Sequence, residues 1–206
     1  NNLIAVWQQD RMNNGGARGL GGAVSFDGGG TWTRISVPFS RCSGGNAANA
    51  GDYQRATDPW VSFSPDGTAY QSALAFSGAS FGAGSANAIT VSRSTDGGLV
   101  WSNPVTLIRD GSGFFNDKEA ITADPTDARH VYVVWDRLVA GNGGGPTWFA
   151  RTTDGGATWE AARPIRDPGP GNQTIGNVIV VLPDGTLVNA FNELVGDPTT
   201  ATIRII

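Results

Sequence analysis

Short apolar stretches separated by turn residues run through the whole chain, and no segment sustains the period of an amphipathic helix. The clearest stretch predicts four strands, at roughly 59–64, 68–76, 87–94 and 101–107. Pro65-Asp66-Gly67 predicts the turn between the first two strands, and Pro183-Asp184-Gly185 predicts the same turn later in the chain. The pattern therefore predicts an all-β chain built from four-stranded antiparallel units.

An eight-residue motif predicts the turn between the third and fourth strands of each unit. It occupies residues 25–32, 94–101 and 152–159 and reads hydroxyl residue, any residue, Asp, Gly, Gly, two variable positions, Trp. The carboxylate can accept backbone N–H groups of its own turn, the glycines allow positive φ, and the indole can cover the turn. We expect structural roles for the recurring residues of these boxes, which are Asp27, Trp32, Asp96, Trp101, Asp154 and Trp159.

An aromatic residue gives a second repeat with the same period. Trp7, Phe76, Trp135 and Phe191 end the predicted second strands, and the first three precede their box aspartates by 20, 20 and 19 residues. The box aspartates themselves are 69 and 58 residues apart. Four-stranded units that repeat at this period are typical of propeller blades.

The boxes and their spacing resemble the Asp-box, or BNR-repeat, proteins of the sialidase superfamily, and the resemblance covers nearly the whole chain. It implies a β-propeller of four-stranded antiparallel blades, six when complete. About three and a half blades are expected here, at approximately 1–36, 57–107, 116–166 and 174–206. Because residues 3–7 match a second strand and a fourth box aspartate is expected near position 211, we expect further chain or another copy to supply the remaining blades.

Composition narrows the possible functions. The net charge is −4 and Lys118 is the only lysine, so no basic face for nucleic acid is expected. No apolar run approaches the roughly 18 residues of a membrane span. Cys42 is the only cysteine and His130 the only histidine, so we expect a buried or shielded thiol, no Cys–His catalysis, no metal site and no cofactor. The resemblance implies an extracellular or secreted protein.

Charged residues gather where first strands start and second strands end, which is one face of a meander propeller. Two carboxylates that flank a glycosidic bond suffice for most glycoside hydrolysis. The catalytic candidates are Asp58, Asp117 and Glu119, with Asp58 and Asp117 expected to begin adjacent first strands. The substrate-binding candidates are Arg11, Arg18, Arg55, Lys118 and Glu193. The same charges could instead form salt bridges that hold blades in register, and Asp136-Arg137 is the most probable structural pair.

The sialidase resemblance does not extend to a catalytic set. It implies three arginines, an acid/base Asp and a Tyr activated by Glu, yet residues 12–24 contain no aspartate. A later segment, 182–187, matches the family pattern, but the implied Glu falls near Gly176 or Asn177 and the implied Arg near Asn192. The sequence therefore predicts a secreted, sialidase-like, glycan-active propeller, with glycoside hydrolase as the leading hypothesis. The alternative is a non-catalytic propeller that binds glycan or protein on the same face.

Overall fold

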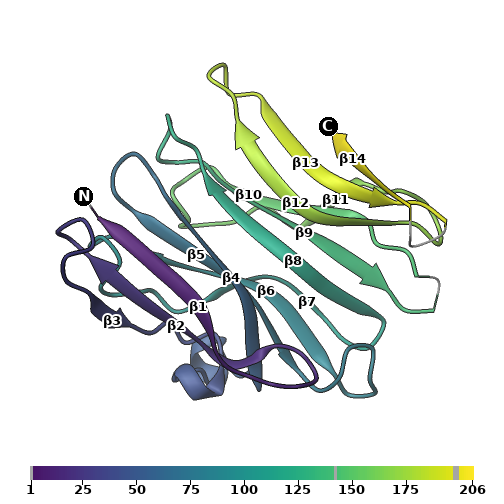
Figure 1. The fold of residues 1–206 in the computed structure, drawn as a ribbon, viewed down its shortest axis with the longest axis horizontal. Helices are drawn as coiled ribbons and strands as arrows, with labels where there is room; N and C mark the ends of the chain where they lie inside the picture. The colour runs from purple at the N-terminus through teal and green to yellow at the C-terminus, as the bar shows by residue number, and fades with distance from the viewer. Residues whose placement is uncertain (1, 142, 197–199) are drawn as a thin grey trace.

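The chain folds into antiparallel sheets with almost no helix. The computed structural model describes residues 2–141, 143–196 and 200–206. The described strands form three hydrogen-bonded sheets, and the first of these divides into two units. The resulting four units, numbered 1 to 4 in chain order, follow one another from the purple end to the yellow end of Figure 1. Unit 1 holds β1 (Leu3–Arg11), β2 (Ala17–Ser25) and β3 (Thr33–Ile35), and unit 2 holds β4 (Arg55–Phe63), β5 (Ala69–Ser77), β6 (Ala86–Ser94) and β7 (Val105–Asp110). Unit 3 holds β8 (Phe114–Ala123), β9 (Val131–Val139), β10 (Thr147–Thr152) and β11 (Arg163–Arg166). Unit 4 holds β12 (Gln173–Val181), β13 (Leu187–Leu194) and β14 (Ala201–Ile205).

Each unit is a meander, and side chains join the units. Strands that are neighbours in sequence pair within each unit, whereas units 1 and 2 share a single ladder pair, Ala17 with Ala56. The first strand of unit 3, β8, contacts both β4 and β12. The strands predicted at 59–64, 68–76 and 87–94 are confirmed within a few residues. The strand predicted at 101–107 begins only at Val105, because residues 101–104 still belong to the connection after the box turn.

The core lies between successive units, because the sheet of unit 3 is covered by unit 2 on one face and by unit 4 on the other. One face of β9 carries Val131, Val133 and Trp135, which pack toward unit 2. Its other face carries Tyr132 and Val134, which pack with Ile179 of unit 4. Burial on both faces explains why the middle strands are almost continuously apolar instead of alternating.

The box turns form as the motif predicts. The Asp27 carboxylate accepts hydrogen bonds from the backbone N–H and the hydroxyl of Thr31, and Asp154 accepts the same pair from Thr158. Asp96 accepts the backbone N–H groups of Leu99 and Val100. Each carboxylate also accepts the hydroxyl of the residue two positions before it. These hydrogen bonds keep the box aspartates within their own turns.

The predicted aromatic repeat is wrong at Phe76. The hydroxyl residue that opens each box pairs with Leu3, Ala69 and Val131 in the three units, which aligns their second strands. Four residues further along, Trp7 and Trp135 share one position, and unit 2 has Ala73 there. Phe76 lies three residues beyond that position, opposite Arg55 and Asn87. Equal spacing in sequence therefore hid a difference in ladder register.

The first strands of units 2, 3 and 4 each contain a bulge at the same place. The register shifts lie between Thr57 and Trp60, between Asp117 and Ala120, and between Ile175 and Val178. The first residue inside each shift has positive φ: 50° at Asp58, 51° at Lys118 and 70° at Gly176. Because a bulge redirects the local side chains, polar side chains at these positions can point in directions that the regular ladder does not allow.

Two other sequence expectations can be compared with the fold. Cys42 is a free, exposed thiol in the 3-10 turn η1 (Arg41–Ser43), which precedes η2 (Ala47–Asn49), so the prediction of a buried or shielded thiol is wrong. Among the residues that the structure describes, no helix is long and apolar enough to cross a membrane.

Candidate functional site

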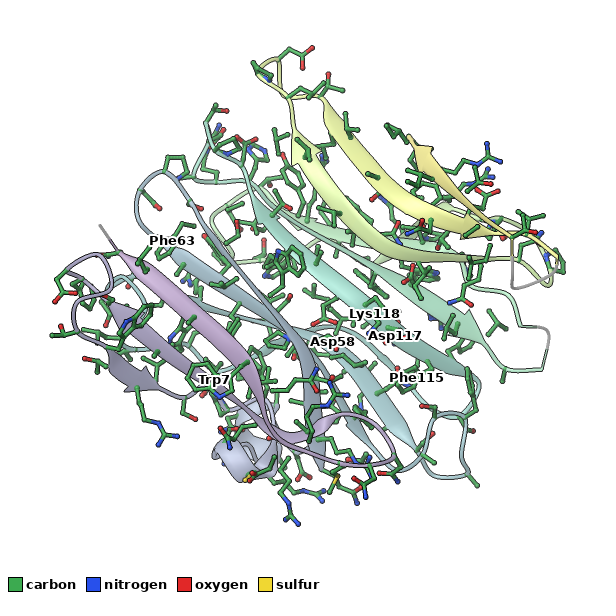
Figure 2. The ribbon with its side chains drawn as sticks, viewed as in Figure 1. Trp7, Asp58, Phe63, Phe115, Asp117 and Lys118 are labelled. Atoms are coloured by element: carbon green, nitrogen blue, oxygen red, sulfur yellow. The ribbon has the colours of Figure 1, made fainter. Side chains whose placement is uncertain are left out.

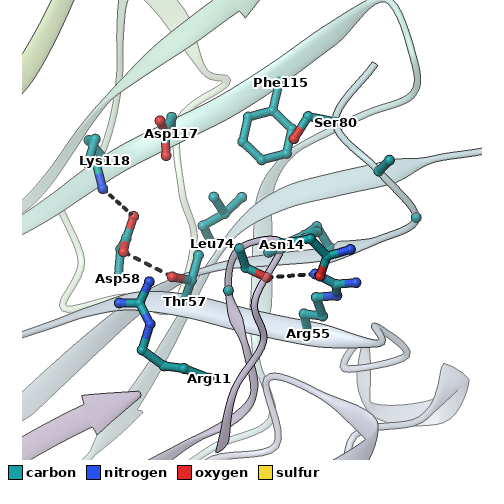
Figure 3. Close-up of a pocket in the computed structure, with 15 residues that line it drawn as sticks. Arg11, Asn14, Arg55, Thr57, Asp58, Leu74, Ser80, Phe115, Asp117 and Lys118 are labelled. Carbon is teal, nitrogen blue, oxygen red and sulfur yellow. Dashed lines mark hydrogen bonds and ion pairs between the residues drawn. The ribbon is translucent and has the colours of Figure 1, made fainter. Parts of the chain in front are cut away.

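A cleft of about 370 Å³ opens where units 1, 2 and 3 meet. Figure 3 shows its polar side chains, with Asp58 and Thr57 on β4 facing Asp117 and Lys118 on β8. Figure 2 places Asp58, Asp117 and Lys118 close together among the side chains of the inner strands. The lining residues are Arg11, Asn14, Gly15, Gly16, Arg55, Thr57, Asp58, Leu74, Phe76, Gly78, Ala79, Ser80, Phe115, Asp117 and Lys118.

Asp58 accepts hydrogen bonds from three sides of the cleft. Its Oδ2 pairs with Lys118 Nζ at 3.3 Å, while Oδ1 accepts Thr57 Oγ1 at 2.9 Å and Gln8 Nε2 at 3.2 Å. The three donors come from units 3, 2 and 1, so Asp58 joins all three. These hydrogen bonds fix the orientation of the Asp58 carboxylate in the cleft.

Asp117 is half-buried like Asp58, whereas Glu119 is buried. Burial raises the pKa of Asp117, Lys118 opposes that rise, and the charge of Asp58 adds to it. Burial raises the pKa of Glu119 well above its ordinary value, and Asp58 and Asp117 raise it further. Glu119 is 3% exposed and is not among the residues that line the cleft. The structure therefore places one candidate carboxyl group in the cleft as an acid with raised pKa, and a second carboxyl group behind it.

The bulge register explains why Glu119 has no partner. Both of its carboxyl oxygens are buried without a hydrogen bond in the described part of the chain. In unit 4 the equivalent residue is Asn177, which donates to Asp136 on the second strand of unit 3. The second-strand position that Asp136 occupies in unit 3 is Leu74 in unit 2, since Leu74 lies opposite Thr57 as Asp136 lies opposite Asp117. An apolar side chain at this one position removes the polar partner of Glu119.

Asp136 holds units 3 and 4 together. Its carboxylate accepts Thr174 Oγ1, the backbone N–H of Gly176 and Asn177 Nδ2. The residue has no exposed surface, and burial raises its pKa to about 8 despite these donors, with a further rise from Asp117. The network continues through Thr147, whose hydroxyl contacts both Thr174 and Asn177. Asp136 is therefore a structural partner of unit 4.

Asp136 and Arg137, which the sequence predicts to be structural, do not pair with each other. Arg137 instead forms a bidentate pair with Asp110, at 2.6 and 2.8 Å. Its guanidinium lies 3.5 Å from the ring centroid of Phe114 and 4.5 Å from that of Trp148. Adjacent residues on a strand point to opposite faces, which is why the two side chains separate.

Of the remaining candidates, Arg11 and Arg55 reach the cleft. Arg11 is exposed and lies near Thr57 and Asp58 in Figure 3, where no ion pair or hydrogen bond joins it to the other residues drawn. Arg55 Nη1 donates to Asn14 Oδ1 at 2.8 Å and to the carbonyl of Gly15 at 2.6 Å, so its position is fixed. Phe76 and Phe115 stack edge to face at 5.9 Å and form the apolar wall.

Arg18 and Glu193 do not line the cleft. Arg18 is exposed on β2, and its backbone carbonyl accepts Ser40 Oγ. Glu193 belongs to unit 4, and Arg166 of unit 3 donates to its carboxylate at 2.9 to 3.2 Å.

Two residues that shape the cleft were missed in the sequence. Gln8 and Leu74 occupy equivalent positions on the second strands of units 1 and 2, and each faces the bulge of the next unit. Only an alignment of the strands by ladder register relates them, because their residue types differ. In the described residues no group of three His, Cys, Asp or Glu side chains is arranged to hold a metal ion.

Comparison with known proteins shows the fold. No family model and no curated protein matches the chain in sequence. Among solved structures, an α-L-arabinanase from Penicillium chrysogenum is similar at a TM-score of 0.67 and 15% identity, over 99% of this chain and 57% of that one. A Hadza microbial sialidase gives 0.63 and 18%, over 100% and 42%, and a protein of unknown function from Dyadobacter fermentans gives 0.65 and 16%, over 100% and 57%.

At these low identities the similarity shows the fold alone. The chain spans between 42% and 57% of the length of those three proteins. Its antiparallel units therefore have the sialidase-like propeller fold, which arabinanases and sialidases share.

Proposed function

We propose that the chain is part of a secreted glycoside hydrolase that cleaves glycans in the cleft between units 1, 2 and 3. The observation that carries the proposal is the pairing of two unlike carboxyl groups in one cleft. Burial raises the pKa of Asp117, while Asp58 is held by three donors. Two carboxyl groups whose environments differ in this way are suited to opposite roles in acid–base chemistry.

In this mechanism Asp117 protonates the glycosidic oxygen and Asp58 acts on the other side of the sugar as base or nucleophile. Lys118 and Thr57 hold the Asp58 carboxylate, and Gln8 extends that support from unit 1. Arg11 offers its guanidinium to ring hydroxyl or carboxylate groups of the glycan. Phe76 and Phe115 provide an apolar surface for the face of a sugar ring.

We further propose that the four sheet units are blades of a six-bladed propeller and that further chain or another copy supplies the others. The support is that the chain covers a little over half of an arabinanase of the same fold. The similar proteins include sialidases and arabinan-degrading enzymes, which makes both sugar classes reasonable substrates to test. Sialosides are the weaker candidates, because Arg11 and Arg55 are the two arginines that line the cleft among the described residues, and Arg55 is already engaged.

The test compares aryl arabinofuranosides, arabinan oligosaccharides, sialosides and neutral aryl glycosides as substrates. Asp117→Asn and Asp58→Asn should each lower kcat at least about 100-fold, the usual contribution of an acid or base group. Asp10→Asn is the matched control, since Asp10 is an exposed aspartate at the end of β1 that does not line the cleft. Glycan binding with no turnover on any substrate would contradict the enzyme and favour the non-catalytic binding propeller.

A further inference from the structure

The loop between β5 and β6 places an aromatic side chain at the edge of the cleft. Gly78, Ala79 and Ser80 of this loop line the cleft, and Phe81 follows them directly. Figure 3 shows Ser80 beside Phe115, and the ring centroids of Phe81 and Phe115 are 6.2 Å apart. Phe81 is therefore a neighbour of the cleft that the proposed mechanism does not use.

Three phenylalanines extend the apolar wall of the cleft outward. Phe115 contacts both of the others, with its ring centroid 5.9 Å from that of Phe76 and 6.2 Å from that of Phe81. Phe76 is buried, Phe115 is half-buried and Phe81 is 39% exposed. The series therefore runs from the interior, through the lining of the cleft, to a ring that solvent can reach.

Phe81 has a backbone conformation that a bulky residue rarely adopts. Its φ is 61°, in the left-handed region that glycine and asparagine occupy more easily. Five non-glycine residues have positive φ in the described part of the chain. Two of them, Asp58 and Lys118, pair with each other in the cleft, and a third, Asp10, directly precedes Arg11. Strain of this kind persists where a side chain is needed at a particular place.

The loop holds Phe81 in position through its own hydrogen bonds. The carbonyl of Ala79 accepts the backbone N–H of Gly82 at 2.9 Å, and the carbonyl of Gly82 accepts that of Ser85 at 3.0 Å. At the base of the loop the backbone N–H of Gly78 donates to Gln54 Oε1 at 3.1 Å. Two successive turns on an anchored base order the ring in advance, which lowers the entropic cost of binding a ligand against it.

The aromatic residue is particular to unit 2. The equivalent loops, which join the second and third strands of the four units, are residues 12–16, 78–85, 140–146 and 195–200. Phe81 is the only aromatic residue in these four segments of the sequence. The repeating fold therefore does not require an aromatic side chain in this loop, and the reason for it must lie in the surroundings of unit 2.

We propose that Phe81 binds a second sugar of the glycan, next to the sugar on which Asp58 and Asp117 act, an inference that rests on the proposed function. The C–H face of this second sugar stacks on the exposed part of the phenyl ring, while its hydroxyl groups remain in water. Phe115 supports the ring from the side of the cleft. The substrate class is thus an oligosaccharide, in preference to a single sugar on a small leaving group.

The test compares two substrates that share the reacting sugar. An oligosaccharide places a second sugar beside the bond that breaks, whereas a glycosyl fluoride has a single atom there; for arabinan the pair is arabinobiose and α-L-arabinofuranosyl fluoride. Phe81→Asn removes the ring and keeps a residue that accepts positive φ. It should lower kcat/KM for the oligosaccharide about three- to tenfold, the scale of one stacked aromatic contact, mainly through KM. The value for the fluoride should not change.

Two further variants separate stacking from folding. Phe81→Trp keeps an aromatic face and should retain the preference for the oligosaccharide. Phe26→Ala removes an exposed phenylalanine of the unit 1 box that does not line the cleft, and it should leave both substrates unaffected. The melting temperature of each variant shows that it is folded.

A binding measurement distinguishes this inference from the proposed function. Calorimetry in the Asp117→Asn background gives the affinity for the oligosaccharide without turnover, and adding Phe81→Asn should weaken it about three- to tenfold. That result supports the second sugar site even where the wild type cleaves no substrate. Equal losses on the oligosaccharide and the fluoride, or an unchanged oligosaccharide affinity, would overturn the site and leave the hydrolase standing. No binding of any oligosaccharide would overturn both.

Discussion

Asp58 and Lys118 occupy the same bulge position in units 2 and 3, and their side chains pair with each other across the seam at 3.3 Å. Both residues have the positive φ that the bulge requires. The repeat therefore brings equivalent positions together with opposite charges. The pair also acts on Asp117: burial raises the pKa of this carboxyl group, Lys118 lowers it and Asp58 raises it.

Replacing Lys118 should change the pH dependence of activity. Burial raises the pKa of Asp117 and Lys118 lowers it, so Lys118→Met should raise it further. If Asp117 is the general acid, activity falls as pH rises through this pKa, and the alkaline limb of kcat/KM should move to higher pH in the variant. Arg41→Met, which removes a surface cation paired with Asp52, should leave the limb in place. A shift toward lower pH would contradict the assignment.

Glu119 should make the fold less stable at alkaline pH. Its folded pKa is raised well above its ordinary value, so the unfolded chain releases the proton first as pH rises. Stability should therefore decline as pH rises above about 4.3, the unfolded pKa of Glu, until the folded pKa is passed. Glu119→Gln should lose less stability than the wild type between pH 5 and pH 9 in denaturant titrations. Glu160→Gln, an exposed control, should follow the wild-type profile.

The box aspartates should have the opposite pH dependence. Hydrogen bonds from Thr158 and Thr152 lower the pKa of Asp154 to about 2, so its contribution is present above about pH 4 and is lost as pH falls toward 2. Asp154→Asn replaces one acceptor oxygen with a donor and should lower the melting temperature at neutral pH. The difference from wild type should shrink in acid. Asp10→Asn is the control, and an equal loss there would contradict a role specific to the turn.

Trp135 and Trp7 offer a matched comparison, since they share one ladder position in units 3 and 1. Trp135 is fully buried and donates from Nε1 to Asn116 Oδ1 at 2.8 Å, whereas Trp7 is 37% exposed. Trp135→Phe leaves that buried oxygen short of a partner and should lower the free energy of unfolding by about 1–3 kcal/mol. Trp7→Phe should change it by less than about 0.5 kcal/mol. Chemical denaturation of both variants measures the difference, and equal effects would contradict the argument from burial and from the Asn116 hydrogen bond.

The features that follow from local chemistry could be predicted from the sequence, and those that depend on register could not. The boxes at Asp27, Asp96 and Asp154 are self-contained turns, so their pattern revealed both their place and their hydrogen bonds. The prediction that Asp58 and Asp117 begin their strands was wrong, since both lie inside the strand. They also differ by one position in ladder register, because Asp58, Lys118 and Gly176 occupy the bulge without sharing a residue type. The isolation of Glu119 depends on Leu74, which lies 45 residues earlier in the chain.

The meander within each unit has a consequence for how the chain folds. Every strand of a unit finds its ladder partner in the next segment of sequence, so the loops that must close are short and the entropy of closing them is small. Units 1 and 2 share one ladder pair, which leaves the contacts between units to side chains. Low contact order within units favours rapid local pairing, with docking between units as the later and slower event. A chain of this design can acquire its sheets one after another as it leaves the ribosome.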